Sequence, residues 1–198
     1  WEADRKRSLD EMTHDLAGVT FHEKLGSMAE KTQRLVALSG ALAEAWQLSA
    51  QEADALRQAC HYAKADLVST MVKEFPTLQG VMGKSYARLA GEPPSVCRAI
   101  EEHYLPLGDK LPQTLIGSAL AILDKYDTLS SYFAQGIVPT GDQDPFGLRR
   151  AAQGIVEVAW KVHRPLPLNA LFEARATTAP FWGPGVEPAT RAQRAVGR

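Results

Sequence analysis

Apolar residues recur every three or four positions along most of the chain, the spacing that places them on one face of an α-helix. The clearest stretch ends at Trp46, which this pattern predicts to be buried. No alternation of apolar and polar residues extends beyond four positions, so the sequence predicts no sheet. The expected helices cover approximately residues 5–17, 27–46, 49–74, 78–89, 96–104, 113–133 and 145–160.

Three of these helices begin with the same polar signature. A serine is followed three positions later by a glutamate at Ser8–Glu11, Ser27–Glu30 and Ser49–Glu52. In such a capping box, the hydroxyl and the carboxylate bind N–H groups that the first helical turn leaves free. In the last expected helix, Asp144 is predicted to be the N-cap and Pro145 the first helical residue.

The helical period disappears near Arg175, after which proline, glycine and alanine dominate. We therefore expect one helical domain over residues 1–172 and a linker or incomplete element over residues 173–198. The 198 residues, 45% of them hydrophobic, suffice for one buried core. Because the chain begins with Trp1 rather than methionine, we expect a piece of a longer protein.

Composition argues against several classes of protein. The net charge of −1 argues against a general polyanion binder, although it allows a local basic face. Cys60 and Cys97 are too few and too isolated for a disulfide framework or a zinc site, so we expect a reducing, cytoplasmic setting. No apolar run approaches the ~20 residues of a membrane span, and no signal peptide is recognisable.

The stretch "IGSALAILDKYDTL" places two acids in an otherwise apolar helix. Asp124 and Asp127 are three positions apart and share one helix face. A helix this apolar is expected to be buried over most of its circumference, where an ionised carboxylate needs a cation, a metal or several hydrogen bonds. The alternative is that both acids lie with Lys125 on a narrow solvated stripe.

Five blocks occur in a distinctive order: "FHEKLGSMAEKTQRLVAL", "KADLVSTMVKEFPTLQGVMGKSYA", "EEHYLP", "ALAILDKYDTL" and "VPTGDQDPFGLRRAAQGI". Together they resemble the beta subunit of bacterial-type glycyl-tRNA synthetase, in its HD-like helical domain. The resemblance covers roughly Trp1 to Val162. It implies an all-α fold, an HD-domain-like bundle of about seven or eight helices without a sheet.

Active members of the HD superfamily hold divalent metals with an early His, a His–Asp pair and a distant Asp. By this resemblance, the corresponding residues here are Lys31, Ala65, Asp66 and Asp124. Two carboxylates and an ammonium hold a transition metal poorly, so we expect no metal. Instead, we predict that the Lys31 ammonium bridges Asp66 and Asp124 as a structural ion pair, with Ala65 leaving room for the lysine stem.

Other residues do not restore a catalytic site. His61 lies one helical turn before Ala65, from where its imidazole could turn toward the site. His103 lies near a helix end, where we expect it to cap the helix or face solvent. Neither Cys60 nor Cys97 has a histidine and an acid at a telling spacing, so we expect no catalytic group in this chain.

The resemblance further implies an enzyme that joins glycine to its tRNA with ATP and Mg²⁺, with the adenylate chemistry in a separate alpha subunit. This chain would hold no cofactor and no metal itself. Its expected partners are the alpha subunit, tRNA(Gly) and the remaining domains of the beta subunit, with no membrane. Its expected work is to bind or position tRNA and to scaffold the complex.

Two basic pairs are candidates for RNA contact. Lys84 and Arg88 are four positions apart in "GKSYARLAG", and Arg149 and Arg150 open the last helix, whose backbone donors also favour phosphate.

Three alternatives remain open from the sequence. Arg149 or Arg150 could simply pair with Asp142 or Asp144. The whole chain could be a metal-dependent HD phosphohydrolase that acts on nucleotides, against which Ala65 and Lys31 argue directly. It could also be a structural spacer that makes no RNA contact.

Overall fold

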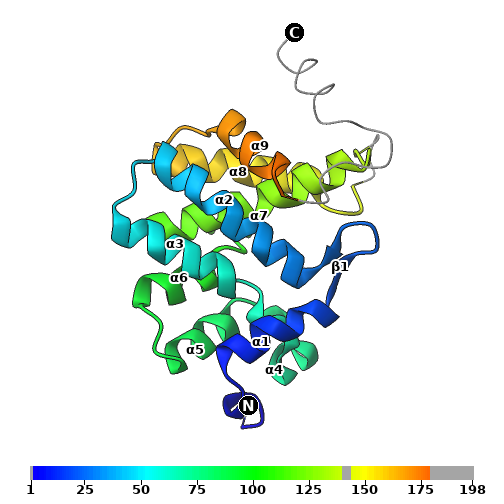
Figure 1. The fold of residues 1–198 in the computed structure, drawn as a ribbon, viewed down its shortest axis with the longest axis vertical. Helices are drawn as coiled ribbons and strands as arrows, with labels where there is room; N and C mark the ends of the chain where they lie inside the picture. Colours follow the sequence, from blue (N-terminus) through cyan, green and yellow to red (C-terminus); the bar gives the residue numbers. More distant parts are fainter. Residues whose placement is uncertain (1, 140–143, 179–198) are drawn as a thin grey trace.

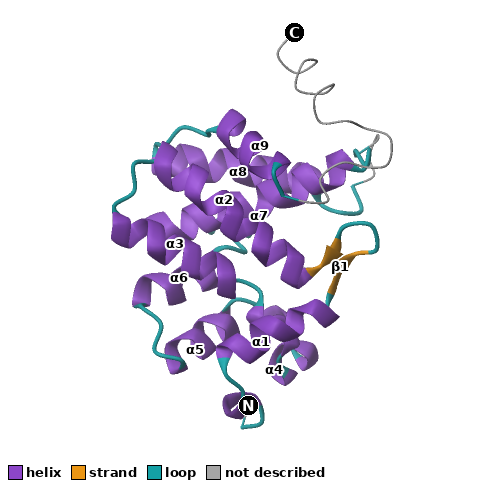
Figure 2. Ribbon diagram, viewed as in Figure 1, coloured by secondary structure: helices purple, strands orange, loops and turns teal. Residues whose placement is uncertain are grey.

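A computed structural model describes residues 2–139 and 144–178, which form a helical bundle with one small hairpin (Figures 1 and 2). The all-α expectation is confirmed. The described α-helices are α1 (Leu9–Asp15), α2 (Met28–Ala45), α3 (Ala50–Tyr62), α4 (Thr70–Glu74), α5 (Val81–Leu89), α6 (Pro94–Glu102), α7 (Leu115–Ala134), α8 (Leu148–Val162) and α9 (Leu168–Ala176). The strands are β1 (Thr20–His22) and β2 (Gly26–Ser27), and 3₁₀ turns cover Asp4–Lys6, Leu16–Gly18, Ala65–Val68 and Pro76–Leu78.

Helix α7 forms the centre of the bundle, in contact with α2, α3, α6 and α8 (Figure 1). Its sequence explains this position, because the stretch from Ile116 to Leu123 carries no charge and all its residues are buried. Helix α9 lies on α2, and α5 pairs with α6. The largest hydrophobic side chains that are fully buried are Met12, Leu16, Leu35, Leu38, Leu42, Trp46, Leu56, Ile100, Leu120, Ile122 and Leu123.

The three predicted capping boxes are confirmed, each with the serine hydroxyl and the glutamate carboxylate bound to the N–H groups of the first turn. The burial of Trp46 is confirmed as well. Its side chain has no exposed surface, and its indole N–H donates to the carbonyl of Pro165 at 2.9 Å.

The helix expected over residues 49–74 is interrupted. Helix α3 stops at Tyr62, a 3₁₀ turn follows, and α4 begins only at Thr70. The new start is capped by the hydroxyl of Ser69 and by the carboxylate of Asp4, which accepts the N–H of Thr70 at 2.8 Å. The break together with α9 explains why the described ranges hold nine α-helices where about seven or eight were expected.

The expectation of no sheet was wrong at one place. Strands β1 and β2 form an antiparallel hairpin, with Thr20 opposite Ser27 and His22 opposite Gly26. Strands of three and two residues are too short to show alternation. The positive φ of Gly26, 83°, lets the chain turn back directly into the N-cap of α2.

The predicted domain boundary lies too early. Residues 173–176 form the end of α9, and the side chain of Arg175 is only 1% exposed. The other residues of the expected linker, 179–198, lie outside the described part of the chain. None of the helices in residues 2–139 and 144–178 has the length and apolarity that a membrane span requires.

Candidate functional site

Two helices and one turn bring a compact group of charges into the bundle. Lys31 extends from the first turn of α2, Lys64 follows α3, and Asp124 and Asp127 are one turn apart on α7. The Nζ of Lys31 lies 3.2 Å from Asp124 Oδ1 and 3.2 Å from Asp127 Oδ2. The Nζ of Lys64 lies 3.2 Å from Asp124 Oδ2, so each oxygen of Asp124 meets a different ammonium.

Asp127 is fully buried and shared by three cations. Arg34 donates from Nε to Oδ1 at 2.7 Å and from Nη2 to Oδ2 at 3.1 Å, and the Nε of Arg175 lies 3.4 Å from Oδ1. Burial alone raises the pKa of Asp127, but Lys31 and the arginines outweigh it, so the pKa lies below its ordinary value. The same balance holds for Asp124. Burial raises its pKa, but Lys31 and Lys64 lower it by more, so the pKa lies below its ordinary value.

His103 supports Lys64 from α6. The Nδ1 of His103 lies 2.6 Å from the carbonyl oxygen of Ile100, so Nδ1 carries the proton and donates. The free lone pair on Nε2 then accepts from the Lys64 ammonium at 2.8 Å. Burial and the neighbouring Lys64 charge hold the pKa of His103 well below its ordinary value, so the imidazole is neutral. The expectation that His103 caps a helix is confirmed, because it is the C-cap of α6 and donates to a carbonyl of the last turn. The alternative that it faces solvent was wrong, because the side chain is fully buried.

Asp66 is buried apart from this group. Its Oδ2 accepts the N–H of Gly80 at 2.7 Å and of Gly83 at 3.0 Å, while Oδ1 has no hydrogen-bond partner among the described residues. Both glycines are required by close approach. A Cβ on Gly80, whose φ is +79°, would meet the Tyr104 ring at 2.8 Å, and a Cβ on Gly83 would meet Ile100 at 2.7 Å. Burial raises the pKa of Asp66 despite the backbone donors.

The predicted bridge from Lys31 to Asp66 is therefore corrected. Lys31 does pair with Asp124, but its second carboxylate is Asp127, and Asp66 is held by backbone N–H groups. The residue of this turn that reaches Asp124 is Lys64, one and two positions before the predicted pair Ala65 and Asp66. Ala65 is fully buried in the hydrophobic core.

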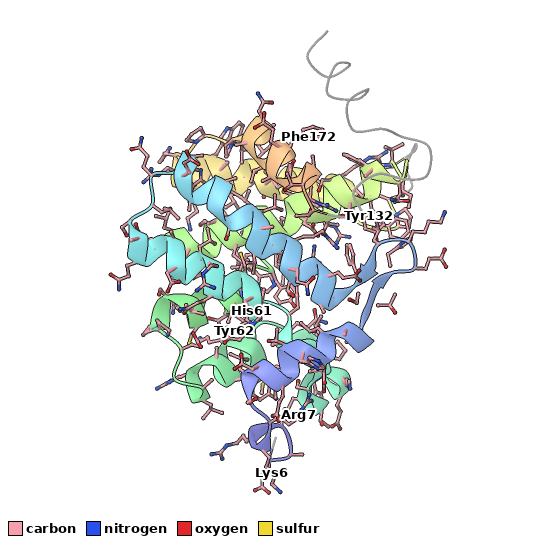
Figure 3. The ribbon with its side chains drawn as sticks, in the orientation of Figure 1. Lys6, Arg7, His61, Tyr62, Tyr132 and Phe172 are labelled. Atoms are coloured by element: carbon pink, nitrogen blue, oxygen red, sulfur yellow. The ribbon has the colours of Figure 1, made fainter. Side chains whose placement is uncertain are left out.

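His61 takes no part in the site. It is exposed, and its ring lies against that of Tyr62 with 4.7 Å between centroids (Figure 3).

Substitution of Asp66 with asparagine should make the protein more stable at neutral pH. A raised folded-state pKa means that the contribution of Asp66 to stability is fully present below its ordinary pKa of 3.8 and is lost as the pH rises through the folded value. The amide keeps an acceptor for the two glycine N–H groups and carries no charge. Chemical unfolding between pH 4 and pH 7 should show that the free energy of unfolding of the variant increases relative to that of the parent as the pH rises.

Asp4 is the matched control for this experiment. It is also a buried carboxylate that accepts two backbone N–H groups, from Thr70 and Met71, but its pKa is lowered. Burial raises the pKa of Asp4, but the hydrogen bonds lower it by more. The contribution of Asp4 to stability is therefore present above pH 3.8 and is lost in acid. Asp4→Asn should therefore lose stability at neutral pH. If Asp66→Asn does the same, the assignment of a raised pKa to Asp66 is wrong.

A divalent metal does not fit this site. The atoms that converge on Asp124 are the ammonium groups of Lys31 and Lys64, and the Nε2 of His103 is occupied by Lys64. Across the described ranges, no three His, Cys, Asp or Glu side chains come close enough together to hold a metal ion.

The basic pairs selected from the sequence lie on the surface, and they differ in their surroundings. Lys84 donates to Glu101 at 2.8 Å, so its charge is partly compensated within the protein. Arg88, at the end of α5, is exposed. Arg149 and Arg150 are exposed in the first turn of α8.

Two of the backbone donors at the start of α8 are already occupied. Asp144 accepts the N–H of Leu148 at 2.7 Å and of Arg149 at 2.9 Å. Asp144 thus caps the helix from a distance rather than as the adjacent N-cap, which is Gly147, and Pro145 precedes the helix. The expectation that these donors favour a phosphate is corrected accordingly. Asp142, the other acid considered as a partner, lies outside the described residues.

Comparison with known proteins identifies the family. The family model described as "Glycyl-tRNA synthetase beta subunit" matches residues 1–195. The chain belongs to the glycyl-tRNA synthetase beta subunit family. The chain is 46% identical over 179 residues to the glycine–tRNA ligase beta subunit of Trichodesmium erythraeum, and 44% identical over 179 residues to that of Streptococcus pyogenes serotype M3.

These alignments cover most of this family member but only part of its relatives. They include 89% and 87% of the chain, against 25% and 26% of the two relatives. The chain thus spans about a quarter of the length of the relatives that it matches.

Several residues of the charge network in this member of the glycyl-tRNA synthetase beta subunit family were not predicted from the sequence. Lys64, Arg34 and Arg175 are absent from the predicted site, yet all three are buried. One signal was available. A helix as apolar as α7 that carries Asp124 and Asp127 requires buried cations from other elements, and Arg34 lies one turn from Lys31 on α2.

Proposed function

We propose that this chain is a non-catalytic helical module of a glycine–tRNA ligase beta subunit. In this proposal it helps to bind or position tRNA(Gly) and scaffolds the complex with the alpha subunit and with the remaining domains of the beta subunit. The complex as a whole joins glycine to tRNA with ATP and Mg²⁺, and it works in the cytoplasm. Family membership and the names of the relatives support the proposal.

The observation that carries the non-catalytic part is the closed charge network. Lys31 and Lys64 fill the space around Asp124, and the carboxylates there are held as partners of cations. Such a centre has neither ligands for a metal nor an open coordination position for water. The alternative of a metal-dependent HD phosphohydrolase is therefore not supported. The network instead holds α2, α7 and α9 in fixed positions, as a scaffold requires.

The observation that favours RNA over a bare spacer is the exposure of arginines on two helices. Arg88, Arg149 and Arg150 are exposed. Arginine on a helix surface is suited to phosphate because its guanidinium donates several hydrogen bonds in one plane.

A triple variant should bind tRNA(Gly) more weakly than the full-length parent protein. It carries the substitutions Arg88→Gln, Arg149→Gln and Arg150→Gln. Each lost phosphate contact should lower the slope of log affinity against log salt by about 1. A titration with labelled tRNA at several salt concentrations measures both quantities. Lys84→Gln should have a smaller effect, because Glu101 already compensates that charge.

Arg57→Gln is the matched control, since this exposed arginine on α3 pairs with Asp54. It should leave affinity and salt slope unchanged. If the triple variant also binds tRNA with the affinity and slope of the parent, the module makes no RNA contact through these residues and the spacer alternative is favoured.

A further inference from the structure

A cluster of aromatic rings lies where the hairpin meets the end of α7 and the segment before α8 (Figure 3, Tyr132). The Tyr132 ring centroid lies 4.6 Å from that of Phe146, 5.3 Å from that of His22 and 5.8 Å from that of Phe21. The His22 and Phe146 rings also meet, at 5.8 Å. Three segments that are distant in the sequence thus converge on one aromatic group.

The cluster has a buried base and an open edge. Tyr132 is 5% exposed, whereas Phe146 is 43% exposed and has solvent on part of its ring. Beside Phe146 is a hollow of about 120 Å³. This volume is near the ~150 Å³ of a cavity that takes up one benzene molecule, so the hollow suits a single flat ring rather than a helix. It is lined by Ile137, Val138, Pro139, Asp144, Pro145, Phe146 and Leu148.

Two exposed cations belong to the segments that form the aromatic cluster. Arg150 is exposed, and its guanidinium lies over Gly147, where a Cβ would approach Nη2 to 3.2 Å. Gly147 has a φ of +65°, so a side chain at this position would be strained and would also displace the arginine. No ion pair of Arg150 occurs among the described residues. Lys24, in the turn of the hairpin, is exposed near His22, whose Nδ1 accepts the Lys24 N–H at 3.2 Å.

We infer that this aromatic site, formed by His22, Tyr132 and Phe146, stacks one unpaired nucleotide of RNA, and that Arg150 binds the adjoining phosphate. The inference rests on the proposed tRNA-binding function and adds the kind of RNA feature that is bound. Aromatic rings beside arginine suit unpaired nucleotides, because every base offers a flat face to a ring and the guanidinium meets its phosphate. In a duplex, the bases stack on one another and present no free face.

The test measures how tightly the full-length protein binds each of two RNA probes. One is a short single-stranded RNA that contains the fluorescent base 2-aminopurine, and the other is a blunt-ended RNA duplex of two strands. Phe146→Leu keeps an apolar contact with Tyr132 but removes the ring. It should weaken binding of the single-stranded probe by roughly tenfold and reduce the quenching of 2-aminopurine, while binding of the duplex stays unchanged. Arg150→Gln should weaken binding of both probes and lower the salt slope.

Phe133→Leu is the control for the loss of an exposed ring, because Phe133 is also 43% exposed and follows Tyr132 on α7. It should bind both probes like the parent. If Phe146→Leu retains the affinity and quenching of the parent, or if Phe133→Leu loses as much, stacking on Phe146 is overturned while tRNA binding through the arginines stands. If the parent binds neither probe nor tRNA(Gly), the proposed function fails as well.

Discussion

Replacement of Asp127 with asparagine should lower the free energy of unfolding by roughly 3–5 kcal/mol. Asp127 is fully buried and is the acidic partner of Lys31, Arg34 and Arg175. Asparagine has nearly the same shape but no negative charge, so the three buried cations lose a carboxylate that they share. Unfolding in urea, followed by circular dichroism, measures the difference between variant and parent.

Asp54→Asn is the control, since Asp54 pairs with Arg57 at 2.8 Å on the surface, where an ion pair contributes about 1 kcal/mol or less. The pH supplies a second check. The pKa of Asp127 lies below its ordinary 3.8, so its stabilisation is present above 3.8 and is lost as the pH falls through the folded value. The difference in the free energy of unfolding between the parent and Asp127→Asn should therefore become smaller in acid. A difference that becomes larger would contradict the assigned charges.

Trp46→Ala should cost about 3–5 kcal/mol, the range for a large aromatic side chain removed from a core. Trp46 closes α2, has no exposed surface and hydrogen-bonds to Pro165. The substitution leaves a cavity and removes the hydrogen bond to the Pro165 carbonyl. Trp160→Ala is the matched control, because Trp160 is 76% exposed on α8 and should change stability by about 0.5 kcal/mol or less. Thermal unfolding of the two variants should give clearly different midpoints, and similar midpoints would refute the placement of Trp46.

Helix α2 was predictable almost to the residue because its signals are local. The capping box at Ser27 marks its start, and one apolar stripe continues to Trp46. Such signals depend on residues within one or two turns, so they can be read without knowledge of the fold. The starts of α1 and α3 were predictable for the same reason.

The break before α4 was not predictable, because the groups that cause it are far apart in the sequence. The carboxylate that accepts the N–H of Thr70 belongs to Asp4, 66 positions earlier. The apolar period continues through the break, since Val68 and Val72 are both buried in the core. Helix α9 was missed because its nine residues give little periodicity, and it is held by a buried arginine rather than by an apolar stripe alone.

The charge network was predictable in part. The pairing of Lys31 with Asp124 follows the positions expected from the family resemblance. The predicted pairing of Lys31 with Asp66 is not found, because that prediction assumed a continuous helix through residues 62–68. Lys64 leaves helical geometry, with φ −114° and ψ 4°, and a 3₁₀ turn follows. This change of backbone directs Lys64 rather than Asp66 toward Asp124, and only tertiary structure reveals it.

Arg175 sets a limit on how this protein can be shortened for the laboratory. A truncated chain that stops at residue 172, where composition alone places the end of the bundle, would lack the guanidinium that lies 3.4 Å from Asp127 and donates to Ser131 at 3.0 Å. The lost last turn of α9 would uncover part of α2 as well. A piece intended for crystallisation or for reassembly with the rest of the synthetase should therefore extend beyond Ala176.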